Sequence, residues 1–155
     1  MRSDVSAGIG AGLAAGVVFG LMMQMMTAPT PEGGAMPMMA MVAMVVRSNS
    51  VVVGWIYHLF NSAVIGAIFG WLAAGRLAGL TAGLGWGAAY GFLWWVLGAL
   101  VLMPLFLGMP PFAPLMMEPM RPVALGSLMG HLIYGVILGG VFVMLGQRAP
   151  VGARA

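Results

Sequence analysis

The chain has 155 residues, of which 62% are hydrophobic and only 6% are charged. Soluble globular domains carry about 25% charged residues, so this composition excludes a soluble globular fold. The six basic residues are scattered singly, which excludes the basic patch that a nucleic-acid partner requires. Cysteine is absent, so the chain has neither a disulfide framework nor a thiolate metal site.

The first predicted element is an apolar helix near residues 5–26, long enough for the roughly 20 residues that a bilayer crossing needs. No small-residue cleavage site precedes Thr27, so we predict a retained span rather than a secretory signal. A strip of glycines lets another helix approach closely, which drives association in lipid. The span therefore carries a predicted packing strip, a glycine zipper, made of Gly8, Gly12, Gly16 and Gly20.

A Pro-rich loop follows and ends in an apolar run, residues 36–46, which is too short to cross a membrane. Such a run predicts an interfacial or re-entrant segment. The second span is predicted near residues 51–74. It holds His58 near its start, with Asn61 and Ser62 one turn further on.

The third span is predicted near residues 79–102 and the fourth near 122–146, separated by a second apolar loop that is rich in Pro and Met. The fourth span holds His131, with Ser127 a turn before it and Tyr134 about a turn after it. The third span repeats the packing strip of the first, with Gly79, Gly83, Gly87 and Gly91.

The sequence therefore indicates a tandem duplication. Residues 11–23 align with 82–94, and residues 58–70 align with 131–143, with glycine phase, histidine and loop character in the same order. We predict an all-α fold: one membrane domain, residues 1–155, forming a four-helix bundle from two parallel two-helix repeats, about 5–75 and 79–148. A pseudo-twofold axis along the membrane normal would place the two histidines at similar depth.

The arginines predict the orientation of the bundle. Arg47 and Arg121 precede the two histidines, on one side of the predicted topology. The other side carries more of the positive charge, with Arg2, Arg76, Arg148 and Arg154. Because positive charge concentrates on the cytoplasmic side, we expect a multi-pass protein of the prokaryotic cytoplasmic membrane with both termini in the cytoplasm.

Histidine inside a membrane span is costly, so the pair His58 and His131 is a functional-site hypothesis. Two imidazoles at one depth can ligate haem b, a chlorin magnesium or a metal ion from two helices. Neighbouring side chains would orient the rings: Asn61, Ser62, Ser127 and Tyr134. The alternatives are that each histidine fastens the bundle through a hydrogen bond, which we favour, or takes part in proton transfer.

Methionine is concentrated toward the predicted non-cytoplasmic half, with nine of the 17 between Met22 and Met44 and six between Met103 and Met129. Thioethers suit copper(I). We favour the alternative that flexible Met side chains fill gaps under the loops, because no combination of Met and His recurs at a fixed spacing. We therefore predict no dedicated metal site.

Two segments, Gly54–Gly70 and Met129–Phe142, together with the Met- and Pro-rich loop before each, carry a resemblance. In these segments the chain resembles a family of small, uncharacterised prokaryotic integral membrane proteins with four helices and a histidine in the second and fourth spans. The resemblance covers nearly the whole chain. It implies the four-helix architecture and no particular activity.

The spans contain no Asp, Glu, Lys or Arg well inside them, and no nucleophile stands with both a base and an orienting acid. We therefore expect a protein that is not an enzyme: an accessory or scaffolding subunit of a larger respiratory or photosynthetic membrane complex. Its partners would be the lipid bilayer and other membrane subunits or a second copy. The alternatives are a bis-histidine cofactor protein and, with less support, a small dimeric channel or transporter.

Overall fold

A computed structural model of the chain describes residues 2–30 and 33–147 and is mostly helical. Four helices are long and apolar enough to cross a membrane, which confirms that prediction: Ser3–Gln24, Val51–Ala73, Leu80–Phe106 and Glu118–Gly146. Arg148 and Arg154, which were used to predict the orientation, lie outside the described residues.

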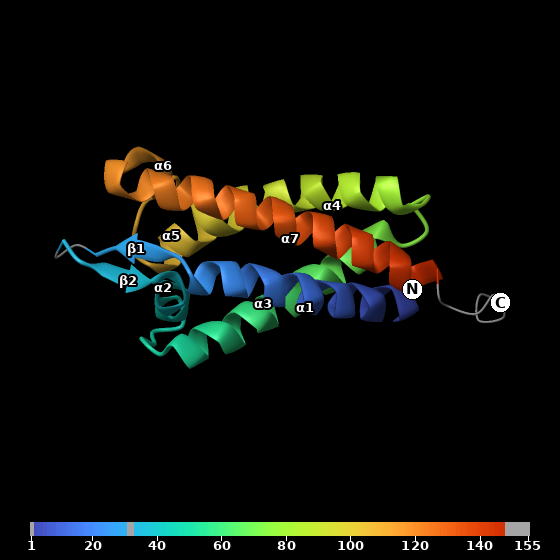
Figure 1. The fold of residues 1–155 in the computed structure, drawn as a ribbon, viewed down its shortest axis with the longest axis horizontal. Coiled ribbons are helices and arrows are strands. Elements are labelled where there is room, and N and C mark those ends of the chain that lie inside the picture. Colours follow the sequence, from blue (N-terminus) through green and yellow to red (C-terminus); the bar gives the residue numbers. More distant parts are fainter. Residues whose placement is uncertain (1, 31–32, 148–155) are drawn as a thin grey trace.

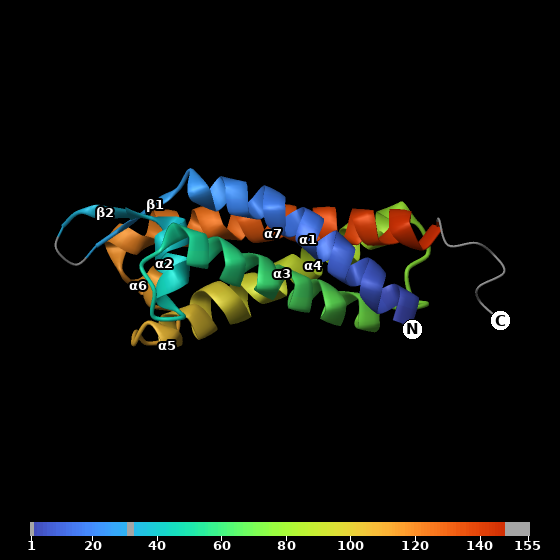
Figure 2. The same ribbon diagram turned by 90° about the horizontal axis from the view of Figure 1, so that it is seen from below.

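The long helices lie side by side along the molecule (Figures 1 and 2). The first, second and fourth are α1 (Arg2–Gln24), α3 (Val51–Ala73) and α7 (Arg121–Gln147). The third is a continuous run of α4 (Leu80–Trp94), the π-helical segment η1 (Trp95–Leu102) and α5 (Met103–Phe106). The start of α1 and the end of α7 lie at one end of the bundle, and the short connecting elements lie at the other.

Glycines hold α1 against α3 at very close range. A Cβ atom added to Gly12 would overlap the carbonyl oxygen of Ser62 and stand 2.9 Å from the Cα of Gly66. Gly8 meets the backbone of Gly66 and Gly70 in the same way. The bare strip of α1 therefore packs on the next long helix, backbone against backbone.

The second pair, α4 and α7, uses the same kind of contact. A Cβ atom on Gly87 would overlap the carbonyl oxygen of Gly135 and stand 3.1 Å from the Cα of Gly139. Gly83 and Gly91 likewise face the backbone of α7. The two predicted strips therefore pack within their own hairpins and not against each other.

Gly79, the first glycine of the second series, has a different place. It precedes α4 with a φ of 91°, a backbone conformation that favours glycine, and no atom lies within 4 Å of where its Cβ would stand. Gly75, in the same short connection, has a φ of 68°. Gly79 therefore shapes the turn between α3 and α4 rather than a contact between helices.

The two hairpins pack together mainly along α1 and α7. Helix α1 packs along α7, where the Phe19 ring fills the space that a side chain on Gly130 would occupy. Between α3 and α4 the described residues form no comparable interface. The two helices meet where Phe69 packs on Tyr90, with ring centroids 5.2 Å apart, and where the Tyr90 hydroxyl donates to the carbonyl of Ile65. The bundle is therefore closed at α1–α7 and looser at α3–α4.

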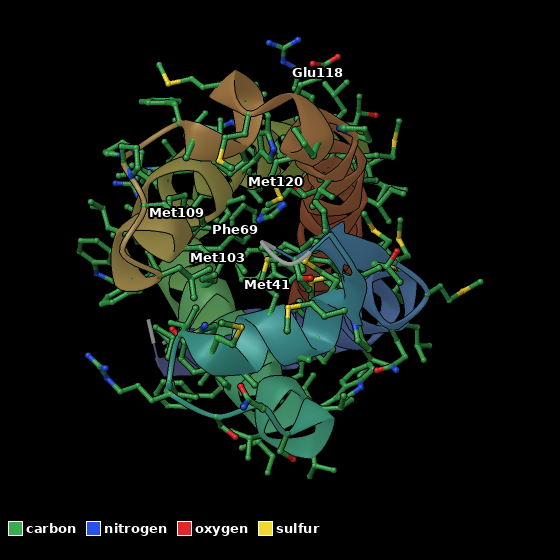
Figure 3. The ribbon with its side chains drawn as sticks, turned by 90° about the vertical axis from the view of Figure 1, so that its left-hand side faces the viewer. Met41, Phe69, Met103, Met109, Glu118 and Met120 are labelled. Carbon is green, nitrogen blue, oxygen red and sulfur yellow. The ribbon has the colours of Figure 1, made fainter. Side chains whose placement is uncertain are left out.

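Short elements cover the end that faces the viewer in Figure 3. The first loop forms two antiparallel strands, β1 (Thr27–Pro29) and β2 (Ala35–Pro37), which the all-α prediction omitted because three-residue strands are too short to show an alternating pattern. The apolar run after them forms α2 (Met38–Met44), whose Met39 carbonyl lies against Gly54 of α3. The second loop forms α6 (Ala113–Met116) and the 3₁₀ turn η2 (Glu118–Met120).

Candidate functional site

One cavity, of about 360 Å³, lies in the half of the bundle nearer the short elements and is lined by both histidines. All four long helices contribute to its walls, together with α2 and α5. Sites for small molecules commonly measure about 300–1,000 Å³, so this cavity has the size of a ligand site. The structure also brings to it every polar residue that the sequence placed near the histidines: Asn61, Ser62, Ser127 and Tyr134.

The cavity occupies the looser side of the bundle. Its rim includes Val64 of α3, Leu102 of η1 and Phe106 of α5, all of which are exposed. Gly98 and Ala99 of η1 also line the cavity, and they are too small to fill this part of its wall. π-Helical segments often occur at functional sites, and here the segment borders an opening that faces sideways from the bundle.

His58 fastens two helices. The N–H at Nε2 donates to the carbonyl oxygen of Gly16 on α1, at 2.8 Å, because a carbonyl can only accept. In the neutral imidazole the other ring nitrogen, Nδ1, is then unprotonated. Gly16 makes this approach possible, since a Cβ atom there would stand 2.6 Å from the Cβ of Ser62. Gly20, one turn on, gives the same room to the rings of Trp55 and His58.

His131 bonds within its own helix. The N–H at Nδ1 donates to the carbonyl oxygen of Ser127, one turn earlier, at 2.7 Å. The unprotonated nitrogen of the neutral ring is therefore Nε2. The two histidines thus share a cavity but differ in tautomer, and the hydrogen bonds of both rings go to backbone carbonyls rather than to neighbouring side chains.

Phe19 connects the two imidazoles. Its ring centroid lies 5.7 Å from that of His58 and 4.8 Å from that of His131, in edge contacts with both. Phe19 was not among the predicted site residues. Its one signal in the sequence was its alignment with Tyr90 in the predicted second repeat, but the two rings have different surroundings, because Tyr90 bonds to Ile65 instead.

Three of the four neighbouring polar side chains have hydrogen bonds inside the protein. The Ser62 hydroxyl donates to the carbonyl of His58 at 2.8 Å, and the Tyr134 hydroxyl donates to the carbonyl of Ser62 at 3.1 Å. The Ser127 hydroxyl donates to Ala124 and accepts from the indole of Trp95. The bonds between elements join α7 to α3 and to η1. All three hydroxyl hydrogens are used, so none of these side chains can donate to a ligand.

Asn61 differs from them. Its amide makes no side-chain hydrogen bond with any of the residues that the structure describes, although it lines the cavity. The indole N–H of Trp94, which is also in the cavity wall, is buried. It forms no hydrogen bond of good geometry with any of the described residues. The cavity therefore contains unused hydrogen-bonding capacity at Asn61, at Trp94 and at the two imidazoles.

The arrangement can hold an apolar molecule and present polar groups to one part of it. Among residues 2–30 and 33–147, no group of three His, Cys, Asp or Glu side chains is placed to hold a metal ion, so any ion at the histidines would need ligands from a bound molecule or solvent. Comparison of the chain with protein-family models, with curated proteins and with solved structures gives no significant match.

Proposed function

We propose that the chain is a non-catalytic integral membrane protein that binds a lipid-soluble molecule in the cavity between its two histidines. The outer surface supports a membrane location. Large apolar side chains project from the long helices, including Leu21, Ile56 and Phe60, which are 55%, 65% and 63% exposed. Contiguous apolar surface of this kind suits contact with lipid or with another membrane protein.

The packing of the two hairpins supports their origin by duplication. In each, glycines of the first helix meet glycines of the second, as Gly12 meets Gly66 and Gly87 meets Gly139. A repeat of two spans would place the start and end of the chain on one side of the membrane. The excess of arginine on that side favours the cytoplasm.

One observation carries the proposed binding function: His58 and His131, from separate hairpins, line a single cavity beside the unpaired amide of Asn61. The amide is half-buried in the cavity wall and forms no side-chain hydrogen bond within the described residues. A ligand that pairs with it would therefore add hydrogen bonds that no protein group makes. The unprotonated imidazole nitrogens would accept from a hydroxyl or N–H group of the same ligand, and its apolar body would fill the remaining space.

The exposed rim suggests how such a molecule enters. In a membrane, the opening between α3, η1 and α5 would face lipid rather than water, because Val64, Leu102 and Phe106 around it are apolar. A ligand could then diffuse in from the bilayer. An isoprenoid quinol has the required features, with an apolar tail and ring hydroxyls that donate hydrogen bonds.

The experiment is to extract the full chain gently from its native membrane and identify the organic molecules that remain in a near-equimolar amount. Mass spectrometry of a solvent extract should find one hydroxyl- or N–H-bearing lipid-soluble compound. His131→Phe, which keeps a ring but removes the acceptor, should retain much less of it. Bulk phospholipid alone, in the same amount for both proteins, would reject the proposal.

Haem or chlorin binding is the second candidate function. The tautomers of His58 and His131 are the observation that favours it. Each imidazole is held by a backbone carbonyl through one nitrogen, an arrangement common among metal-ligating histidines, and keeps the other for a ligand bond. The ligands would be Nδ1 of His58 and Nε2 of His131. A visible absorption band that disappears in both His58→Ala and His131→Ala would support this candidate, and a colourless protein would reject it.

An accessory role in a larger complex is compatible with either ligand. Exposed aromatic side chains on α3 and α4, namely Trp71, Trp86 and Phe92, offer surface for a partner subunit. Size-exclusion chromatography of the same extract tests this role, because a bound subunit elutes with its complex. The alternative of a small channel or transporter predicts solute flux in liposomes.

A further inference from the structure

A second cavity, of about 50 Å³, lies beneath the short elements, and methionine is the commonest residue in its lining. The five methionines that line it come from two distant parts of the chain, α2 and the segment from α5 to η2: Met38, Met41, Met103, Met109 and Met120. Figure 3 looks onto this end and shows Met41, Met103 and Met120 near its middle, with Met109 to one side. The fold therefore converts two Met-rich loops into one cluster.

The interior of this methionine cluster is poorly suited to water. Met38, Met41 and Met120 are only 6%, 8% and 6% exposed. Ser127 supplies the one hydroxyl in the described lining, and that hydroxyl already donates to Ala124 and accepts from Trp95. A buried water needs two to four polar partners, and the side chains here cannot supply them.

The cavity also remains open where methionine would be expected to close it. Met side chains are flexible and fill irregular gaps, and a void between them loses dispersion contacts. Five such side chains nevertheless surround a space large enough for a single ion or atom group. This combination indicates a position for a ligand that thioether sulfur prefers.

We propose that the methionine cluster binds one soft monovalent cation, copper(I) or its analogue silver(I). Thioethers are soft, neutral ligands, which suit a soft monovalent ion. The described lining holds no carboxylate, so it lacks the hard oxygen ligands that magnesium or calcium would require. It also holds no histidine or cysteine, the usual ligands of zinc. The cluster lies at the predicted non-cytoplasmic end, where the ion would arrive from outside the cell.

This site is a distinct cavity that adjoins the histidine-lined one, and four residues line both: Met38, Ala99, Met103 and Ser127. The proposal therefore does not depend on the function proposed above. A variant that loses the lipid-soluble ligand, such as His131→Phe, should still bind the ion.

The test uses the full chain in detergent, silver nitrate in chloride-free buffer, and elemental analysis after desalting. We expect one tightly bound silver per chain. The triple variant Met41→Leu, Met103→Leu and Met120→Leu should bind silver at least tenfold more weakly. Leucine for methionine nearly conserves volume, so the fold should persist, and circular dichroism would check it.

A matched control replaces three exposed methionines outside the cluster. Met25, Met116 and Met144 are 88%, 71% and 51% exposed, and their joint change to leucine should leave the tight silver unchanged. If the control weakens binding as much as the cluster variant does, silver binds at the surface and the proposal is wrong. Unchanged binding in the cluster variant, or loss of binding in His58→Phe with His131→Phe, would also overturn it.

Discussion

Nε2 of His58 lies 2.8 Å from the carbonyl oxygen of Gly16, and this hydrogen bond joins α3 to α1 inside the first hairpin. His131 makes its bond to Ser127 in its own helix. The two positions align in the predicted repeats, yet only His58 joins two helices through its ring. The difference leads to a test of stability that is independent of any ligand.

His58→Phe should destabilise the protein more than His131→Phe. Both changes keep an aromatic ring, but only the first removes a bond between helices, worth about 0.6 kcal/mol on average and up to about 1.7 in membrane proteins. Reversible unfolding in mixed micelles, monitored by circular dichroism, measures the difference. Equal losses for the two variants would show that the bond between helices contributes no more than the bond of His131 within its own helix, and would contradict the prediction.

Gly87→Ala should lower stability by about 1–3 kcal/mol, the usual range for overpacking. Its Cβ would overlap the backbone of Gly135, which cannot rotate away as a side chain can. Gly85→Ala is the matched control on the same helix, because nothing lies within 4 Å of the added atom. Alanine is also the better helix former, so the control should be neutral or slightly stabilising in the same unfolding assay.

Tyr90→Phe and Tyr134→Phe should each weaken the attachment of α3 to the second hairpin. Their hydroxyls donate to two different carbonyls of α3, those of Ile65 and Ser62. We expect a loss of about 0.6 kcal/mol for each, with the effects additive because the bonds share no partner. The double variant in a mutant cycle checks this, and a large coupling energy would contradict independent bonds.

Gly98→Leu should reduce binding in the histidine-lined cavity without unfolding the protein. Gly98 lines the cavity, and an added Cβ meets only Trp94, at an ordinary 3.8 Å, so a larger side chain can enter the empty space. Gly85→Leu makes the same chemical change on the same long helix, where the space is open. The amount of co-purified ligand per chain should fall several-fold in the first variant and stay unchanged in the second.

The sequence is sufficient to predict four long apolar helices, because length, hydropathy and glycine spacing are local properties. It also marked His58 and His131, since a histidine among apolar residues stands out without any knowledge of the fold. The two strands and the π-helical turn of η1 were not predictable, because each is too short or too similar in composition to its helical neighbours.

The contacts between helix faces, by contrast, depend on how the folded chain packs. A glycine strip permits close packing with any helix. The spacing of the glycines therefore did not show whether the strips of α1 and α4 would pack on each other or on the second helix of their own hairpins. Closure along α1 and α7, with looser contact between α3 and α4, depends on how all the side chains fill the space together. The histidine-lined cavity, the position of Phe19 beside both imidazoles and the cluster of five methionines from distant segments all depend on this packing, which no local pattern in the sequence specifies.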